Sequence, residues 1–382
     1  ARQGDKLWIL AGGTPAGGPH TGLASREVAQ SGGLTGLPPF QCGVEGRMQE
    51  LTPPTPPRLN ALPAVPLAAG PFYQVPVAIE TDGEFYNIFG SSSAATSYIG
   101  NLFAYASVIY NREASAKLIV GDVRLWAGGP ASDPWNHTDT LNGLQSFREY
   151  WNTNRTGIKR AVAHFLSGRN LGGGIAYLGA LCDSGNSSYG YGYSADIQGD
   201  FQINNPQPVW DIVVVTHEIG HTFISPHSHC YGGIGGNGNP VDACYVEDGD
   251  GCWSGPTSLP GTNSLTGGTT GGANGTIMSY CHLLNGGLSN IALTFGQNHS
   301  YGIAANRVSS KIASYVAGVA ANNPSCISIG TDSSSYTLTL AKAGTGSGTV
   351  SGGGSYAAGA TVNLSAIANT GSFFANWSPS PC

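Results

Sequence analysis

The stretch HEIGHTFISPHSH, which runs from His217 to His229, decides the fold of this chain. If Asp211 to Phe223 is helical, His217 and His221 are four residues apart and lie one turn apart on the same face. Two imidazoles in that arrangement can share one metal ion, and neutral imidazole is a good zinc ligand. Glu218 then lies beside the metal, where a carboxylate can take the proton of a water molecule. The stretch therefore predicts a zinc site that carries its own base.

A third metal ligand is expected shortly after this helix. His227 supplies it at the spacing H-E-x-x-H-x-x-x-x-x-H, provided that the chain turns back sharply after Phe223. Pro226 is compatible with a helix that has already ended. His229 is a reserve candidate for the same position, although the spacing favours His227. The predicted metal ligands are thus His217, His221 and His227.

A second motif, GTIMSYCH from Gly275 to His282, lies downstream of the first. It places Met278, one of only two methionines in the chain, in a turn of small residues. Together the two motifs resemble the metzincin metallopeptidases, in which a methionine-containing turn lies beneath the metal. The resemblance covers roughly residues 71–320. It implies an α/β catalytic domain of the metzincin type, with a twisted mixed sheet, an antiparallel edge strand, an active-site helix and a methionine turn.

Within this clan the chain is most similar to the adamalysin or reprolysin branch, whose motif is H-E-x-G-H-x-F-G-S-P-H. Two residues depart from the pattern of that branch. Ile224 stands where the family has glycine, and a β-branched residue disfavours the positive φ of that glycine, so the backbone must differ or carry strain. Ser228 stands where reprolysins usually have aspartate, and in this respect the chain is more similar to the matrixins.

The resemblance also assigns roles to residues outside the zinc motif. The stretch from Gly174 to Cys182 corresponds to an edge strand on which a peptide substrate lies antiparallel, since an unpaired strand edge binds peptide main chain. An internal strand without a ligand is the alternative. Tyr280, two residues after Met278, is expected to polarise the scissile carbonyl or, alternatively, to pack in the core. The residues of the expected substrate edge are Ile175, Ala176, Tyr177, Leu178 and Gly179.

Composition and charge indicate the compartment and exclude several partners. The chain has 382 residues, with 58 glycines, 23 prolines and only 10% charged residues, which is typical of secreted, loop-rich proteins. Its formal net charge is -6 and its 16 Lys and Arg residues form no cluster, so nucleic acid and anionic membranes are not expected partners. No apolar run approaches the length of a membrane span. We expect a secreted, extracellular monomer.

The cysteines support secretion, because they form no C-x-x-C pair and histidines already account for the metal. Disulfides in an oxidising compartment are their simplest use, and the pairing cannot be read from the sequence. The resemblance favours a bridge between Cys182 and Cys281. If Cys42 is free and Cys382 has no partner, six cysteines remain for three bridges. The eight are Cys42, Cys182, Cys230, Cys244, Cys252, Cys281, Cys326 and Cys382.

Residues 1–70 are expected to form a pro-segment that ends in an extended, proline-rich connector from Pro53 to Pro66. The stretch FQCGVEG around Cys42 resembles the cysteine switch of metzincin propeptides. There a thiolate takes the fourth position on zinc, and the enzyme is silent until the segment leaves. Gln41 replaces the arginine of the matrixin version, and no aspartate follows at the expected place. The alternative is that Cys42 is an ordinary half-cystine.

Hydrophobic periodicity predicts the elements of a catalytic domain that spans residues 71–322. The run from Ile212 to Val215 favours a strand by propensity, so burial must override it for the zinc helix to form. Residues 230–272 should be irregular and held by disulfides, and within them Glu247, Asp248 and Asp250 form either a solvated acidic loop or a calcium site. Strands are expected at 74–80, 119–126, 161–166 and 174–182, and helices at 94–111, 141–154, 209–223 and 298–317.

Residues 331–382 change in character to Ser, Thr and Gly with alternating strands, which predicts a small all-β module. Four strands are expected there, at 336–340, 348–351, 361–367 and 373–377. The module resembles one truncated copy of a β-repeat that is appended to many secreted bacterial proteins. Such a module suggests attachment to a surface polymer, and a stability or export spacer is the alternative.

The sequence as a whole predicts a secreted zinc endopeptidase that acts on proteins or peptides. Zinc on the three histidines makes a water acidic, and Glu218 deprotonates that water for attack on the peptide carbonyl. Glu218 then passes the proton to the leaving nitrogen. One alternative is a catalytically silent scaffold whose C-terminal module does the binding, although the intact Glu218 argues against it. Another is a zinc hydrolase that acts on a non-peptide amide.

Overall fold

The computed structural model describes residues 2–3, 6–7, 50–53, 71–183, 185–247, 249–260, 274–330, 335–338, 340–342, 345–357 and 362–374. The chain forms two compact units. The larger unit consists of Gly33–Pro66 and Phe72–Ile329, and the smaller unit consists of Ala1–Gly32, Leu67–Pro71 and Gly330–Cys382. Cys42, Asp248 and Cys382 lie outside the described residues.

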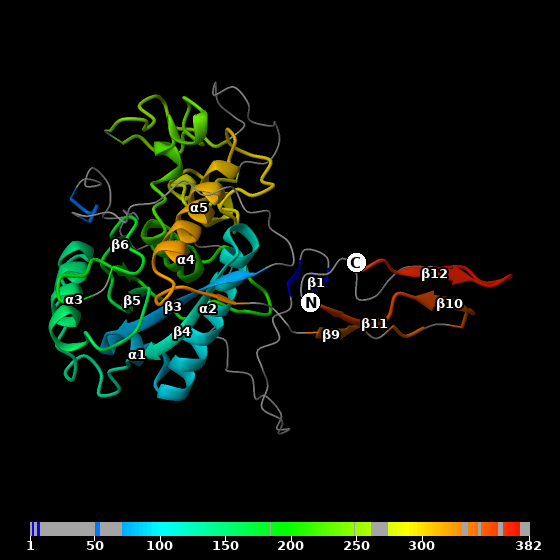
Figure 1. Ribbon diagram of the computed structural model, residues 1–382, viewed down its shortest axis with the longest axis horizontal. Helices are drawn as coiled ribbons and strands as arrows, with labels where there is room; N and C mark the ends of the chain where they lie inside the picture. Colours follow the sequence, from blue (N-terminus) through cyan, green and yellow to red (C-terminus); the bar gives the residue numbers. More distant parts are fainter. Residues whose placement is uncertain are drawn as a thin grey trace. The chain divides into compact units, whose positions relative to one another are not determined.

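A six-stranded mixed sheet forms the centre of the larger unit (Figure 1). The strand order is β4-β3-β5-β7-β6, and β8 also pairs with β3. β4, β3, β5 and β7 run parallel to one another, whereas β6 runs antiparallel to β7 at the end of this order. This confirms the predicted mixed sheet with an antiparallel edge strand. The strands are β3 (Phe72–Thr81), β4 (Ala116–Val123), β5 (Val162–Leu166), β6 (Gly174–Ala176), β7 (Tyr191–Ser194) and β8 (Ser328–Gly330).

Several strands of this sheet differ from the prediction. β8 was not expected, and β6 ends at Ala176 although the strand was predicted to reach residue 182. β4 begins three residues earlier than expected, because Ser115 ends the preceding helix in the left-handed region, at a φ of 50°, and turns the chain directly into the sheet. Ala116 then pairs with Tyr73 at the start of the ladder. β7 was not predicted at all, since its sequence YGYS has no aliphatic residue. All four of its residues are nevertheless buried between β5 and β6.

Five α-helices accompany the sheet, and none of the helices among the described residues is long and apolar enough to cross a membrane. Side-chain caps on Ser91 and Asp139 explain where α2 and α3 begin. α1 was not predicted, although the Asp82 side chain caps its N-terminus by accepting a hydrogen bond from the N–H of Phe85. α5 begins eight residues later than predicted. The helices are α1 (Gly83–Phe89), α2 (Ser92–Ala114), α3 (Thr140–Asn154), α4 (Trp210–Thr222) and α5 (Asn306–Asn322).

The helix α4 forms in spite of its β-branched run, as predicted. Every residue from Trp210 to Thr222 is buried, so the packing of the whole helix outweighs the strand propensity of its valines. Its N-terminus has no side-chain cap. Instead the buried carboxylate of Asp211 accepts hydrogen bonds from the Tyr98 hydroxyl on α2 and from the backbone N–H groups of Gln198 and Gly199. These bonds anchor the start of the helix on which the zinc motif lies.

Irregular chain surrounds the C-terminal end of α4. It contains the short 3-10 helices η1 (Ser228–Cys230), η2 (Ile234–Gly236), η3 (Cys281–Leu283) and η4 (Gly287–Asn290). The pairing of cysteines in this region differs from the one that the resemblance favoured. Cys182 is bonded to Cys326 and not to Cys281, because Cys182 lies at the end of the sheet where the chain returns after α5. Six cysteines do form three bridges, Cys182–Cys326, Cys230–Cys252 and Cys244–Cys281.

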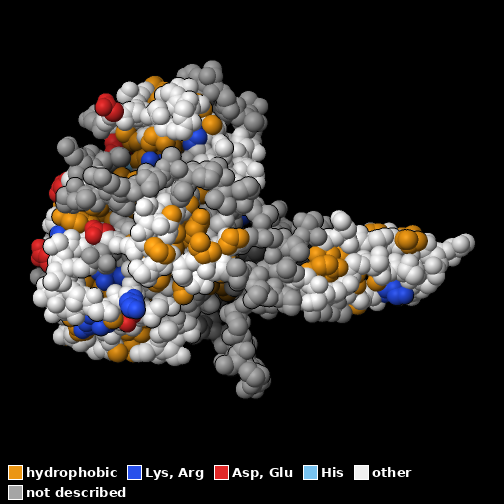
Figure 2. Space-filling model, in the orientation of Figure 1, with side chains coloured by type: hydrophobic (Ala, Val, Ile, Leu, Met, Phe, Trp, Pro, Cys, Tyr) orange, Lys and Arg blue, Asp and Glu red, His pale blue; other side chains and the backbone are white. Residues whose placement is uncertain are grey.

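The described part of the C-terminal module is all-β, as predicted. β9 (Ser335–Leu338) pairs with β11 (Gly354–Ala357), and β10 (Gly348–Ser351) pairs with β12 (Ser365–Ala368), in both cases antiparallel. Groups of hydrophobic side chains lie on the surface of this module (Figure 2). Ile367 is 65% exposed and Phe373 is 85% exposed. At the N-terminus of the chain, β1 (Arg2–Gln3) pairs with β2 (Lys6–Leu7).

Candidate metal centre

The last turns of α4 bring two imidazoles together. His217 and His221 are buried on one face of the helix, and their Nε2 atoms are 3.1 Å apart. Two nitrogen ligands at about 2.0–2.1 Å from a tetrahedral zinc ion are spaced by a similar distance. His217 Nδ1 lies 2.8 Å from the carbonyl oxygen of Ile277, and His221 Nδ1 lies 2.7 Å from that of Ser225. Each Nδ1–H therefore donates to a carbonyl, which leaves the Nε2 lone pair for a metal.

The chain then reverses through a strained turn. Ile224 adopts a φ of 70°, in the left-handed region, so the residue that replaces the family's glycine carries the strain expected from the sequence. Such a conformation costs about 1–3 kcal/mol for a residue that is not glycine. The backbone N–H of Ile224 donates to His221, and that of Ser225 donates to Gly220, which closes the helix. Gly179 leaves room for the Ile224 side chain, because a Cβ there would lie 3.0 Å from Ile224 Cγ1.

This turn returns His227 to the helix. One ligand atom from each of His217, His221 and His227 lies within 4.8 Å of the others, and all three residues are buried. The Nε2 atom of His227 has no hydrogen-bond partner among the described residues. Burial lowers the pKa of His227 to about 4 and holds the pKa values of the other two well below the usual range. Three neutral imidazoles that converge in this way fit a zinc ion.

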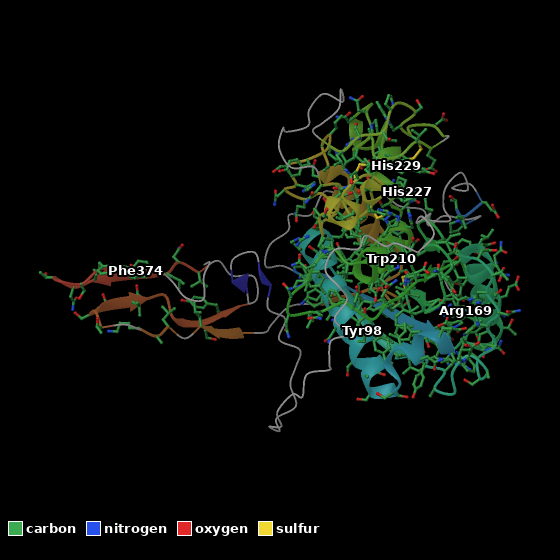
Figure 3. All side chains as sticks on the ribbon, turned by 180° about the vertical axis from the view of Figure 1, so that it is seen from behind. Tyr98, Arg169, Trp210, His227, His229 and Phe374 are labelled. Atoms are coloured by element: carbon green, nitrogen blue, oxygen red, sulfur yellow. A yellow bond between two sulfur atoms is a disulfide. The ribbon has the colours of Figure 1, made fainter. Side chains whose placement is uncertain are left out.

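His229 takes a different position from the three converging histidines. Its ring stacks on that of His227 with the centroids 5.1 Å apart, at the end of α4 remote from Trp210 (Figure 3). His229 Nε2 lies 3.0 Å from Glu247 Oε2, and these atoms form a second group with His227. The group that includes the two α4 histidines contains His227 and not His229. This geometry favours His227 as the third ligand.

Glu218 is completely buried and lies against the start of β6. A Cβ built on Gly174 would be 2.6 Å from Glu218 Oε1, so only glycine at this position lets the carboxylate approach the strand. Glu218 also helps to raise the pKa of Tyr110, although burial of the Tyr110 hydroxyl is the larger cause. The candidate base is thereby held between the zinc helix and the edge of the sheet.

The methionine turn packs directly beneath α4. Met278 is buried, and a Cβ on Gly220 would lie 2.5 Å from its sulfur atom. The carbonyl of Met278 accepts a hydrogen bond of 2.8 Å from the N–H of Ser228, which joins the turn to the loop of the third histidine. Tyr280 is also buried, and its ring centroid lies 4.5 Å from that of His227. The ring of Tyr280 thus packs beside the predicted ligands.

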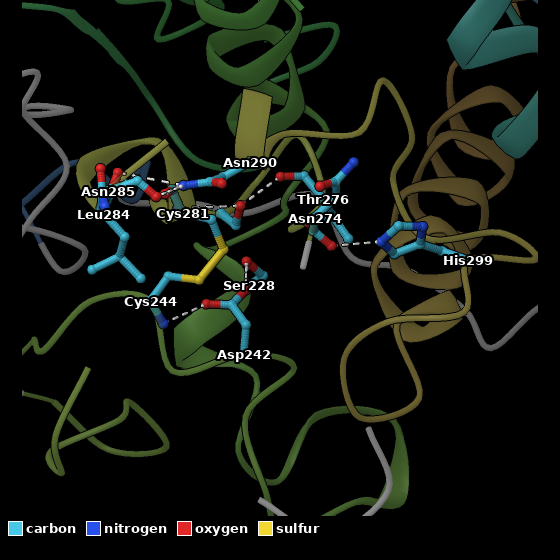
Figure 4. Close-up of a disulfide and its surroundings, with 11 residues drawn as sticks. Ser228, Asp242, Cys244, Asn274, Thr276, Cys281, Leu284, Asn285, Asn290 and His299 are labelled. Carbon is cyan, nitrogen blue, oxygen red and sulfur yellow. Dashed lines mark hydrogen bonds between the residues drawn. A yellow bond between two sulfur atoms is a disulfide. The ribbon is translucent and has the colours of Figure 1, made fainter. Parts of the chain in front are cut away.

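A disulfide also connects the methionine turn to the loop after η1 (Figure 4). Cys281 is bonded to Cys244. Asp242 accepts hydrogen bonds from the Ser228 hydroxyl and, at 3.0 Å, from the N–H of Cys244. On the other side, Asn290 donates to the carbonyl of Cys281 at 3.0 Å. The loop between Ser228 and Ser258 is therefore fastened to the predicted metal centre at several points.

The predicted substrate edge lies alongside the end of α4. Tyr177 N–H donates inward to Tyr191, whereas Leu178 N–H faces away from the sheet and donates to the carbonyl of Leu51 at 3.0 Å. Gly179 N–H donates to His221 at 2.9 Å, which ties this edge to the helix. Leu51 is only 1% exposed. A residue of the predicted pro-segment thus occupies the outward hydrogen-bonding position of the edge.

Glu247 is the residue whose position the sequence did not indicate. It was expected in an acidic loop, either solvated or binding calcium, but it is 7% exposed and its carboxylate faces His227 and His229. A solvated loop is therefore wrong for Glu247. None of the possible metal groups among the described residues contains Asp250, so calcium has no support there. No spacing motif links a glutamate to a histidine 20 residues away.

Comparisons with known proteins agree with this geometry. A family model described as Metallo-peptidase family M12, of the reprolysin type, matches residues 73–290. A second model, the divergent InlB B-repeat domain, matches residues 336–382. No curated protein sequence matches the chain.

Solved structures are similar only at a low level. A structure titled "Structure of a chaperone-substrate complex" is 13% identical with a TM-score of 0.32, and the match covers 64% of this chain and 36% of that one. Metalloproteinase-II from Bacteroides fragilis is 15% identical with a TM-score of 0.27, and the match covers 47% of this chain and 50% of that one. The chain thus spans half or less of the length of these two.

The family assignment depends on the extent of the first match. The M12 model covers more than half of the chain, and it includes the sheet strands β4 to β7, α4 and the turn at Met278. The chain is therefore a metzincin-like member of metallo-peptidase family M12, with a metallopeptidase domain at residues 73–290 and a C-terminal B-repeat module.

Proposed function

We propose that the chain is a secreted zinc endopeptidase whose metal ligands are His217, His221 and His227. The convergence of three buried, neutral imidazoles next to Glu218 is the observation that carries the proposal. When bound, zinc would supply a Lewis acid that polarises the substrate carbonyl and makes a water molecule acidic. The three disulfides are consistent with an oxidising, extracellular compartment.

Glu218 would act as the general base and then as the general acid. It takes one proton from the attacking water and gives it to the nitrogen of the breaking peptide bond, so the carbon gains a hydroxyl and the amine gains a hydrogen. Tyr280 is a second candidate for the reaction, as a donor to the developing oxyanion.

The substrate would bind as an extended peptide along residues 175–179. The outward N–H of Leu178 can pair with a peptide carbonyl, since it already donates to the carbonyl of Leu51 within the chain. Main-chain pairing of this kind is independent of the substrate's side chains. It therefore supports proteins and peptides as substrates rather than small amides.

Casein hydrolysis with and without a zinc chelator tests this function. We expect hydrolysis to stop when the chelator removes the metal and to return when zinc is added back. The reason is that the bound zinc is what makes the attacking water acidic in the proposed reaction. The Glu218→Gln variant, which is expected to be inactive, measures the background rate of casein hydrolysis. Hydrolysis that continues in the chelator at the same rate would contradict the proposal.

We further propose that residues 1–70 keep the enzyme latent. Leu51 covers the edge strand, and Cys42 is the candidate for the fourth position on zinc. Burial of a leucine side chain is worth about 1.5–3 kcal/mol, so freeing this position should raise peptidase activity roughly tenfold to hundredfold. We expect that increase when limited proteolysis cuts the chain between Pro53 and Pro66 and the N-terminal fragment is removed.

The Cys42→Ser variant of the uncut chain separates the two causes of latency. If the thiolate blocks the metal, this variant is active before any cut, whereas occlusion by Leu51 alone leaves it silent. A cut chain that is no more active than the uncut one would exclude a pro-segment role.

The C-terminal module, with its exposed Phe373, is proposed to attach the enzyme to a surface polymer.

A further inference from the structure

We propose that Glu247 is a positioning residue of the zinc site. Its carboxylate orients His227 as the third zinc ligand and also contacts His229, which is not a ligand in this arrangement. The inference rests on the proposed function, because it assumes that His227 binds the metal. It assigns a role in metal binding to a glutamate that neither the zinc motif nor the methionine turn contains.

The first observation is the hydrogen bonding of the Glu247 carboxylate. Its Oε2 atom lies 3.3 Å from His227 Nδ1 and 3.0 Å from His229 Nε2. An ionised carboxylate only accepts hydrogen bonds, so both imidazole nitrogens must carry a proton. In His227 this leaves the lone pair on Nε2, the atom that has no other partner among the described residues and belongs to the converging group. Glu247 thus selects the tautomer of His227 that can bind zinc.

The second observation is the contrast with the other two ligands. His217 and His221 donate from Nδ1 to the backbone carbonyls of Ile277 and Ser225. Those partners follow from the fold and cannot be removed by substitution. His227 Nδ1 instead faces the carboxylate of Glu247, and a carboxylate behind a ligating histidine makes the imidazole a stronger ligand. The third ligand therefore depends on one replaceable residue.

The third observation is the burial of the charge. Glu247 is 7% exposed, and both histidines that it contacts are completely buried. A buried carboxylate among neutral groups is costly unless a positive charge compensates it. The Glu247 carboxylate lies 3.3 Å from the His227 ring and 3.0 Å from the His229 ring. A zinc ion on the far side of His227 would add a positive charge to this buried group.

The loop that carries Glu247 is built to hold it in place. The N–H of Glu247 lies 3.3 Å from the carbonyl of Trp253, and the N–H of Trp253 donates to His229 at 2.8 Å. Cys252, next to Trp253, is bonded to Cys230, directly after His229. A second bridge, Cys244–Cys281, fastens the other side of the loop. Two covalent links on either side of Glu247 keep the carboxylate against the two histidines.

Zinc affinity of the full chain tests the inference, measured by competition with a chromophoric chelator. Loss of a carboxylate partner behind a ligating histidine typically weakens metal binding by about 10–100-fold. We expect Glu247→Ala to show that loss and Glu247→Gln, which keeps an acceptor oxygen but not the charge, to show a smaller one. Asp250→Asn is the matched control, because it removes an exposed carboxylate from the same loop and should bind zinc like the wild type.

A second measurement separates positioning from a merely structural role. X-ray absorption at the zinc edge should report fewer imidazole scatterers in Glu247→Ala than in the wild type, while the melting temperature of the metal-free chain changes little. If Glu247→Ala does not fold, the Glu247→Gln variant carries the same comparison. An affinity within twofold of the wild type in both variants overturns the inference.

The outcomes also distinguish this inference from the proposed function. If the wild type hydrolyses casein and the Glu247 variants bind zinc normally, only the inference is wrong. If the Glu247 variants lose zinc affinity as expected but the wild type hydrolyses nothing, only the proposed function is wrong. A wild-type chain that binds no zinc overturns both.

Discussion

The Glu218→Gln variant is expected to lose peptidase activity by about 10²–10⁴-fold in kcat while it keeps its zinc. Glutamine has nearly the same shape as glutamate, so it preserves the buried packing against Gly174. It cannot accept a proton from water or deliver one to the leaving nitrogen. The measurement is the rate of casein hydrolysis at saturating substrate, with the zinc content determined on the same sample.

Two controls make this result specific to proton transfer. The melting temperature of the zinc-loaded variant should match that of the wild type, because Glu218 is not one of the predicted ligands. Glu218→Ala should show the same loss of activity with a lower melting temperature, since it also leaves a cavity in the buried site. Undiminished hydrolysis in either variant would exclude Glu218 as the base.

The second large effect is expected at the third ligand. His227→Ala should weaken zinc binding by roughly 100-fold or more. Zinc binding at a protein site is worth about 10–16 kcal/mol, and one ligand of four carries about 3 kcal/mol of this if the ligands share it equally. Zinc affinity, measured by chelator competition, and casein hydrolysis should fall together in this variant.

His229→Ala is the matched control for His227→Ala. The two histidines are equally buried, lie two residues apart and contact the same Glu247 oxygen. Only His227 belongs to the group that includes the α4 histidines, so His229→Ala should keep most of its zinc. A larger loss of zinc in His229→Ala than in His227→Ala would show that the ligand assignment must be exchanged.

Much of the catalytic domain follows from local patterns in the chain. The spacing of His217 and His221 requires a helix if the two are to meet, and this requirement correctly outweighed the strand propensity of the valines before them. The alternating strand around Val75 and Val77 and the capped helix after Asp139 were equally readable. The strain at Ile224 was also foreseeable, because it depends only on the residue type and the turn that the third histidine demands.

Other features depend on contacts between distant segments and had no local signal. β7 is a strand because β5 and β6 pair with both of its edges, although its sequence YGYS has no aliphatic residue. The bridge from Cys182 to Cys326 spans 144 residues, and nothing in the spacing of eight cysteines selects it. In each case the deciding interaction is long-range, so the residue types alone leave it open.

The metal centre likewise combines features that the local sequence predicts with one that depends on the tertiary structure. The proposed ligands and the proposed base lie in one stretch of thirteen residues, because a helix and a turn bring them together through local geometry. The orientation of His227 depends on Glu247, which comes from another loop and is held there by two disulfides. Residues that need only be neighbours on a helix can be recognised in the sequence. The carboxylate that contacts His227 cannot, because only the tertiary structure brings the loop of Glu247 against this histidine.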